Sequence, residues 1–318
     1  MRALKIRIGE HMGTPLYQIY GVSGVDELYH EGTTHTQATN VNIFTPRRRK
    51  FQVWGITMDI PSYKDGWTDR TVGHQARPDA GRYNKYSREL PQTPWFVEGE
   101  RKQSTSVQEL LSAILNNTIK AQDLKFSSSG REDVDVRCLG VGRPFVIEFI
   151  NPRHTLLTQT QVAVLQSAVN ESTHLVKLRH LQIVDKKDVK YLKEGEEEKT
   201  KTYCALCLST QGYNTAALDK LNELSEVSVE QKTPLRVLHR RPLATRTRIV
   251  HTITAVPIDL HYFKLYLTTQ AGTYIKEFIH GDLGRTNPNL RQVIGVDLDI
   301  MALDVENVAL DWPPKCSE

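Results

Sequence analysis

The chain has 318 residues and a mass of 36.2 kDa, with 39% hydrophobic and 25% charged residues. This length allows two domains and a sizeable core, and the composition excludes a chain that is disordered throughout. Lys and Arg number 41 against 37 for Asp and Glu, so the net charge is +4. This mild positive excess is compatible with a nucleic-acid partner and is far from that of a histone-like tail.

Cysteine usage and hydropathy favour a protein of a reducing compartment. The four cysteines are too few and too clustered for a disulfide framework. No apolar run approaches the roughly 18 residues of a membrane span, and the N-terminus lacks the apolar segment of a signal peptide. We therefore expect an intracellular protein of the nucleus or cytoplasm without a membrane partner, with the mitochondrion left open.

The sequence changes in character near residue 80. Residues 1–79 are rich in Gly, Thr, Tyr, Asp and His, and they predict irregular structure with short strands such as Phe51 to Thr57. From Arg82 onwards, two prolines and several aromatic residues indicate an ordered extended segment. Residues 80–318 are the part in which regular elements can be predicted.

Helices and strands alternate in this second part. A capping box at Ser106 to Glu109, with the glutamate reaching back to the cap, starts a helix that apolar spacing extends to Ile119. Two more helices are expected at 160–169 and 214–224, and the glutamate-rich stretch 194–199 predicts a solvated loop. Strands are expected at 144–150, 176–184, 201–208, 247–255, 262–268 and 302–310. This order indicates an α+β domain built on a large mixed or antiparallel sheet with flanking helices.

The first segment that could carry chemistry is residues 127–137, SSSGREDVDVR. Three serines and a glycine predict a turn, after which alternation would place Asp133, Asp135 and Arg137 on one face of a short strand. A carboxylate at such a turn can act as a nucleophile or base if a cation keeps it ionised. Spacing alone favours a solvated strand edge with structural ion pairs.

A second segment, residues 270–285, predicts a strand that ends at a small-residue turn, with a short helix from Thr273. Such a turn can present backbone N–H groups to an anion, and Lys276 could point at a phosphate or a carboxylate. The glycines are equally consistent with ordinary turn and helix C-cap positions.

The third segment, KTYCALC, contains a C-x-x-C pair and Tyr203. On a strand, Cys204 and Cys207 point to opposite faces, which is wrong for a zinc site or a disulfide. We therefore expect ordinary strand cysteines and no metal. Tyr203, taken alone, predicts a half-buried aromatic on a sheet.

The fourth segment, residues 233–248, is a compact cationic patch held between prolines. Its basic or titratable residues suit RNA phosphates, although composition fits a solubilising surface loop equally well. The chain has no P-loop, GxGxxG, HExxH or G-x-S-x-G motif, which argues against nucleotide binding, zinc proteolysis and serine hydrolysis.

Taken in this order, the segments resemble the pseudouridine synthase superfamily. Within it they are closest to the archaeal and animal "Pus ten" class, which isomerises uridines in the TΨC loop of tRNA. The blocks that carry the resemblance are GRYNKYSRELPQTPW, SSSGREDVDVRCLGVGRPF, EGEEEKTKTY, QKTPLRVLHRRPLA, TTQAGTYIKEFIHGDLGRTNPN and ALDVENVALDWPP. They span residues 80–318, which the resemblance marks as the catalytic domain.

The resemblance implies a role for individual residues. The essential aspartate falls on Asp133, with Asp135 as its neighbour, and the tyrosine that stacks on the flipped uracil and then serves as general base falls on Tyr203. The basic partner of the aspartate falls on Lys276, and the apolar residue beneath the site on Leu290. RNA contacts are expected from Arg131, Arg236, His239, Arg240, Arg241 and Arg285.

The resemblance also implies a pseudouridine synthase fold, with an RNA-binding cleft across a mostly antiparallel sheet, and a cofactor-free isomerase. The expected partner is the TΨC arm of tRNA, with other structured RNAs as further candidates, and the expected state is a monomer. Animal members carry an N-terminal domain with zinc-binding cysteine pairs, but no cysteine precedes Cys138, so we expect residues 1–79 to lack or replace it. The alternative is a catalytically silent RNA-binding protein, such as an RNA chaperone or a microRNA-processing partner.

Overall fold

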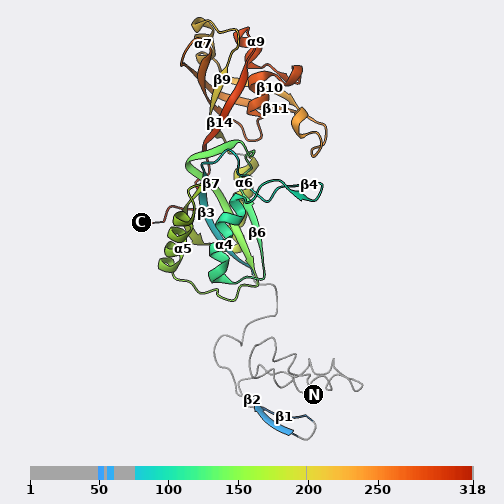
Figure 1. Ribbon diagram of the computed structural model, residues 1–318, viewed down its shortest axis with the longest axis vertical. Coiled ribbons are helices and arrows are strands. Elements are labelled where there is room, and N and C mark those ends of the chain that lie inside the picture. Colours follow the sequence, from blue (N-terminus) through green and yellow to red (C-terminus); the bar gives the residue numbers. More distant parts are fainter. Residues whose placement is uncertain (1–48, 54–55, 61–75, 198, 317–318) are drawn as a thin grey trace. The chain divides into compact units, whose positions relative to one another are not determined.

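A computed structural model describes residues 49–53, 56–60, 76–197 and 199–316 (Figure 1). The chain divides into two compact units, Met1–Gly73 and His74–Glu318. In the first unit, strands β1 (Arg49–Val53) and β2 (Ile56–Ile60) form an antiparallel hairpin where one strand was expected. Other predictions for residues 1–75 lie outside the described residues. The second unit begins before residue 80, because strand β3 crosses that position.

The His74–Glu318 unit is built on a ten-stranded sheet. Its strands are β3 (Ala76–Lys85), β6 (Asp123–Ser128), β7 (Val136–Ile150), β8 (Val176–Ile183), β9 (Lys201–Leu208), β10 (Ser225–Lys232), β11 (Thr245–Pro257), β12 (Tyr262–Thr269), β13 (Thr286–Asn287) and β14 (Asp299–Val308). They run in the order β13-β10-β11-β12-β9-β14-β7-β3-β8, and β6 pairs with β7. The β14–β7 pair is parallel and every other pair in this sheet is antiparallel. The predicted α+β class and mostly antiparallel sheet are confirmed.

Helices pack at both ends of this sheet (Figure 1). They are α4 (Val107–Ile119), α5 (Gln159–Ser172), α6 (Lys190–Glu197), α7 (Thr215–Asn222), α8 (Ile275–His280) and α9 (Leu290–Ile294). The three longer predictions are confirmed by α4, α5 and α7, whereas the loop expected at 194–199 is largely helix α6. At α4, the Ser106 hydroxyl accepts the backbone N–H of Glu109 as predicted, but the glutamate side chain accepts from that hydroxyl and not from the cap backbone.

Two apolar cores lie on either side of the sheet centre. One joins α4 and α5 to β3, β7 and β8 and includes Phe145 and Leu111, while the other joins α7 and α9 to β9–β12 and β14 and includes Phe263 and Leu265. These four side chains have no accessible surface. Burying a side chain of this kind stabilises the fold by about 1.5–3 kcal/mol, so each core holds its end of the sheet rigid. Strands β9, β14 and β7 are thereby fixed where the two cores meet.

Candidate active site

A cavity of about 290 Å³ opens above strands β9, β14 and β7. Its floor is sheet: Val136 of β7 pairs with Leu303 of β14, and Val305 of β14 pairs with Tyr203 of β9, and all four line the cavity. Its walls are the turn that precedes β7, the loop between β10 and β11, and the turn that precedes α8. The four segments selected from the sequence therefore converge on one cavity, although they are separated by up to about half the chain.

Asp133 lies in the turn before β7, not on the strand face that alternation predicted, because β7 begins only at Val136. Lys85 holds this turn from below. Its side chain is completely buried and its ammonium donates to the carbonyls of Asp133 (3.0 Å), Val134 (2.9 Å) and Leu90 (2.7 Å). In a strand, these carbonyl oxygens would accept hydrogen bonds from a neighbouring strand. Here the buried ammonium of Lys85 donates to them instead and fixes the turn in place.

A buried ion pair supports the same turn from the side. Glu132 accepts from Nε of Arg143 at 2.6 Å and from the Tyr83 hydroxyl at 2.8 Å, and Arg143 also donates to the Ser129 carbonyl. Although burial opposes its charge, the carboxylate raises the pKa of Arg143 above its ordinary value. Gly130 has a φ of +82°, and a Cβ there would lie 3.2 Å from the Arg143 guanidinium, so glycine suits both the backbone and the space.

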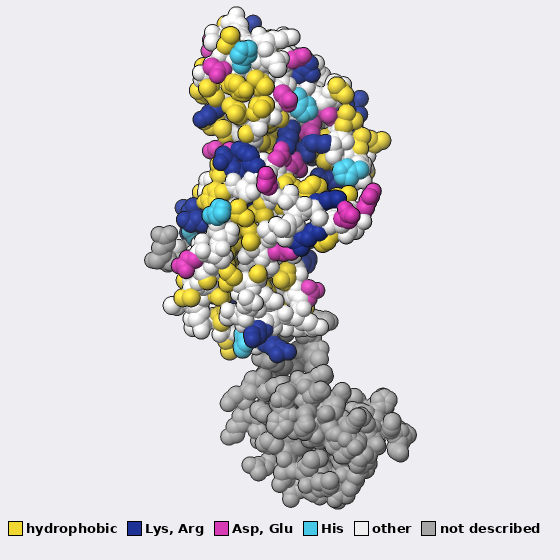
Figure 2. Space-filling view, viewed as in Figure 1, with side chains coloured by type: hydrophobic (Ala, Val, Ile, Leu, Met, Phe, Trp, Pro, Cys, Tyr) yellow, Lys and Arg dark blue, Asp and Glu magenta, His cyan; other side chains and the backbone are white. Residues whose placement is uncertain are grey.

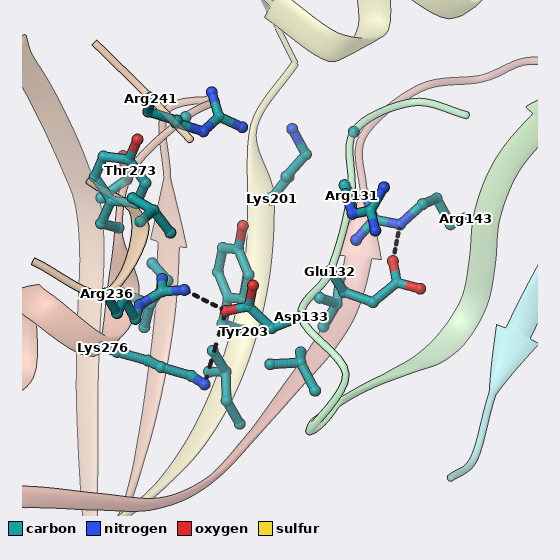
Figure 3. A pocket seen from close by; sticks show the side chains of 18 of the residues that line it. Arg131, Glu132, Asp133, Arg143, Lys201, Tyr203, Arg236, Arg241, Thr273 and Lys276 are labelled. Atoms are coloured by element: carbon teal, nitrogen blue, oxygen red, sulfur yellow. Dashed lines mark hydrogen bonds and ion pairs between the residues drawn. The ribbon is translucent and has the colours of Figure 1, made fainter. Parts of the chain in front are cut away.

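The Asp133 carboxylate faces three cations, two of which, Arg236 and Lys276, are labelled in Figure 3. Oδ2 lies 2.7 Å from Nη1 of Arg236 and 3.7 Å from Nζ of Lys276, and Oδ1 lies 3.9 Å from Nη2 of Arg240. Its side chain keeps 32% of its surface exposed, so a ligand can reach it. Asp133 is therefore an accessible carboxylate with three basic side chains beside it, a setting in which a carboxylate can act as a nucleophile or base.

Lys276 is closer to Asp135 than to Asp133. Its ammonium donates to both oxygens of Asp135, at 2.7 and 2.9 Å. Burial alone would raise the pKa of Asp135, but the hydrogen bond and charge of Lys276 hold it below its usual range. Lys276 therefore reaches Asp133 as predicted, but Arg236 is the nearer partner.

Tyr203 projects from β9 into the cavity beside Asp133 (Figure 3). Burial raises the pKa of Tyr203 to about 12, so the phenol is neutral at physiological pH. A neutral ring on the cavity floor can stack on a planar base and offer a hydroxyl as donor or acceptor.

The residues expected to contact RNA divide into two groups. Arg131, Arg236, Arg240 and Arg241 line the cavity, and Figure 2 shows Lys and Arg side chains mixed with acidic ones across the middle of this unit. His239 is exposed on the same loop but does not line the cavity.

Besides His239, two more expected contacts lie outside the cavity, Arg285 and Leu290. Arg285 donates to the Thr233 carbonyl at 2.7 Å, so it braces the β10–β11 loop. Leu290 is fully buried in the core at the start of α9, and Val136, Leu303 and Val305 take its expected place beneath the site.

In the turn before α8, the backbone N–H groups of Thr273 and Tyr274 are already engaged within the chain, the first by the Gln270 carbonyl. The backbone N–H of Tyr274 donates to the Gln231 side chain at 2.8 Å, which in turn donates to the Tyr274 carbonyl at 2.9 Å. The helix starts at Ile275, with Tyr274 as a cap that makes no side-chain hydrogen bond, so the helix start expected at Thr273 was wrong.

Comparison with known proteins identifies the family. Residues 80–309 match the family model described as Pus10, C-terminal, which is more than half of the chain. The chain belongs to this family. The resemblance stated from the sequence is therefore confirmed.

Curated relatives carry one name across animals and archaea. The chain is 53% identical over 239 residues to "tRNA pseudouridine synthase Pus10" of Homo sapiens, covering 75% of this chain and 45% of that protein. It is 38% identical over 231 residues to the protein of the same name from Thermofilum pendens, covering 72% and 51%. The chain thus spans about half the length of the curated relatives it matches. Among solved structures, a Cbf5-Nop10-Gar1 complex matches with a TM-score of 0.38 and 17% identity, covering 71% of this chain and 47% of that one.

Three functional side chains were not singled out from the sequence: Lys85, Arg143 and Glu277. The first lies in the block GRYNKYSRELPQTPW, in which a lysine before a proline-rich extended segment has no local role. Only its long-range contact with the Asp133 turn explains it. The other two are charged residues inside apolar elements, and a charge at such a position is a usable signal because it needs a buried partner.

Metal ligation and membrane insertion were also considered. Within the described ranges, no group of three or more His, Cys, Asp or Glu side chains is placed to hold a metal ion. Cys204 is half-buried and Cys207 buried on opposite faces of β9, and both are free thiols, as predicted. No helix in the part of the chain that the structure describes is long and apolar enough to cross a membrane.

Proposed function

We propose that this chain converts uridine to pseudouridine in the TΨC arm of tRNA, with Asp133 as the essential carboxylate. The observation that carries the proposal is the placement of Asp133 between Arg236 and Lys276, in the lining of a cavity that also contains Tyr203. Family membership supports the same chemistry, because the curated relatives are named tRNA pseudouridine synthases.

The reaction exchanges one glycosidic bond for another. The target uridine leaves its stack and enters the cavity, which costs a few kcal/mol and is easiest for a loop base. Tyr203 stacks on the uracil, and Asp133 either attacks C1′ or removes a 2′ proton, so that the C1′–N1 bond breaks. The uracil turns in the cavity and bonds to C1′ through C5. This step displaces Asp133 from C1′ on the first route, whereas on the second route Asp133 returns the proton to C2′ as the new bond forms. The C5 proton then leaves and N1 gains a proton, so the isomerisation needs no oxidant or reductant.

The basic wall of the cavity provides the approach for RNA. Arg240 and Arg241 are exposed on the loop between β10 and β11 and line the cavity together with Arg131. Charges in this position attract phosphates and hold the strand next to the flipped nucleotide. In Figure 1 this loop projects on the same side as the hairpin of β4 (Phe96–Val97) and β5 (Glu100–Arg101). The hairpin exposes Phe96 at 56%, which gives RNA bases an aromatic contact.

Tritium release from C5-labelled tRNA transcripts tests the proposal. The wild-type chain is expected to release tritium, and the product is expected to map to the TΨC arm. A transcript with the TΨC-arm uridines replaced is the matched control and should release none above background. Tight tRNA binding without release would instead favour the silent RNA-binding alternative.

A further inference from the structure

We propose that Glu277 is a positioning residue that acts through Arg236 to fix the carboxylate of Asp133. The inference rests on the proposed function and assigns a role within the same site. Glu277 does not line the cavity and does not touch Asp133, so it can act only through the arginine between them.

Glu277 is a buried carboxylate on a rigid support. It is 1% exposed and lies on α8, which begins directly after the turn that Gln231 clamps through two hydrogen bonds to Tyr274. Oε1 accepts from Nε of Arg236 at 2.7 Å, and Oε2 lies 3.4 Å from Nη2. A carboxylate in such surroundings needs a cation, and the bidentate contact fixes the plane of the guanidinium.

Arg236 itself sits on a loop that does not fix it. It lies in the short turn Leu235–Val237, and its side chain is 36% exposed. Burial alone would lower the pKa of Arg236, but the Glu277 carboxylate raises it, so the side chain is a permanent cation. With Nε held by Glu277, Nη1 is directed at Oδ2 of Asp133 at 2.7 Å. Without that anchor, a long side chain on a loop would sample many rotamers, and the carboxylate would lose its closest partner.

The other two cations near Asp133 do not replace this contact. Lys276 donates to Asp135 and lies 3.7 Å from Asp133, and Arg240 lies 3.9 Å away on the exposed loop. Among the described residues, Arg236 is therefore the one cation at hydrogen-bond distance from the Asp133 carboxylate, and its guanidinium is also held by Glu277.

The test is a double-variant cycle on single-turnover isomerisation, using the 318-residue chain and the C5-labelled transcript. Glu277→Gln keeps the shape of the side chain and removes its charge. Arg236→Gln removes the guanidinium that contacts both Glu277 and Asp133. Each should lower the saturated rate constant by about tenfold, the size expected for one charge-assisted hydrogen bond. The double variant should be no slower than Arg236→Gln. The enzyme concentration at half-saturation should change by less than about twofold in Glu277→Gln, because Glu277 is not exposed to RNA.

Glu148→Gln is the matched control, since that glutamate pairs with Lys125 on β6 and lies outside the cavity. It should keep the wild-type rate constant. Independent losses that multiply in the double variant would overturn the inference, and so would a wild-type rate in Arg236→Gln. If a single variant fails to fold, the double variant, which leaves neither charge without its partner, takes its place, and a wild-type rate there would equally overturn the inference.

A second measurement separates this inference from the proposed function. If the wild-type chain releases no tritium, the proposed function fails. Equilibrium unfolding of the wild type, the two single variants and the double variant then tests the contact between Glu277 and Arg236. The contact between Glu277 and Arg236 is supported if the double variant loses less unfolding free energy than the two single variants lose together. Strictly additive effects would overturn it.

Discussion

The buried pair of Glu132 and Arg143 gives a quantitative prediction about the turn that carries Asp133. The Arg143 side chain is 2% exposed and that of Glu132 not at all, and their closest atoms are 2.6 Å apart. Arg143→Met would leave the carboxylate buried with only the Tyr83 hydroxyl, and would also remove the donor to the Ser129 carbonyl. Breaking a buried pair from one side costs about 3–5 kcal/mol. For a unit of this size, that is a fall in melting temperature of roughly 6–20 °C.

Urea denaturation followed by circular dichroism measures this cost. Lys125→Met is the matched control, because its partner Glu148 is 3.4 Å away and the lysine side chain is 69% exposed. We expect a cost below about 1 kcal/mol there. A loss below about 1 kcal/mol in Arg143→Met as well would show that the pair does not hold the turn, and the account of how Asp133 is positioned would be wrong.

Three further predictions concern single side chains. Burial raises the pKa of Tyr203 to about 12, so the single-turnover rate should show no ionisation of this phenol between pH 7 and 10. The pH–rate profile of Tyr203→Phe should therefore have the same shape as that of the wild type. A change of rate with pH that occurs only in the wild type would contradict this. Burial lowers the pKa of Lys85 from 10.5 to about 8, so between these two pH values the unfolded chain binds more protons than the folded chain. The unfolding free energy of the wild type should therefore rise from pH 8 to 10.5 relative to that of Lys85→Met. Urea titrations at several pH values measure this difference. Arg241→Gln should weaken tRNA binding and reduce the slope of log K against log salt by about 1, and an unchanged slope would remove this arginine from the RNA contacts.

Elements set by local sequence could be predicted well. The helix at 107–119 follows a serine cap and a regular apolar face, and strand β9 has the predicted bounds, because both signals lie within a few residues. The turn expected at the serines and Gly130 in fact extends to Asp135, whereas residues 133–135 were predicted as strand because valines alternate with charges there. Its backbone is held by Lys85, about 50 residues away in the chain, and no local pattern reports such a contact.

In the candidate site, too, local motifs predicted some residues, whereas tertiary packing decided the rest. Asp133, Tyr203 and Lys276 do meet in one cavity, because the motifs that carry them mark the ends of fixed strands and one helix. The sequence could not show which cation lies closest to Asp133, since seven basic residues line the cavity with similar chemistry and only tertiary packing ranks them. Arg236 takes that place because the buried Glu277 directs it there.

The most direct test of the central claim compares Asp133→Asn with Asp135→Asn in the tritium-release assay, with tRNA binding measured in parallel. The two aspartates are two residues apart and both face Lys276, but of the two only Asp133 lines the cavity. The account predicts that Asp133→Asn binds tRNA almost normally but loses at least about 10³-fold in rate, whereas Asp135→Asn still turns over measurably. Turnover by Asp133→Asn at a rate near that of the wild type would contradict it.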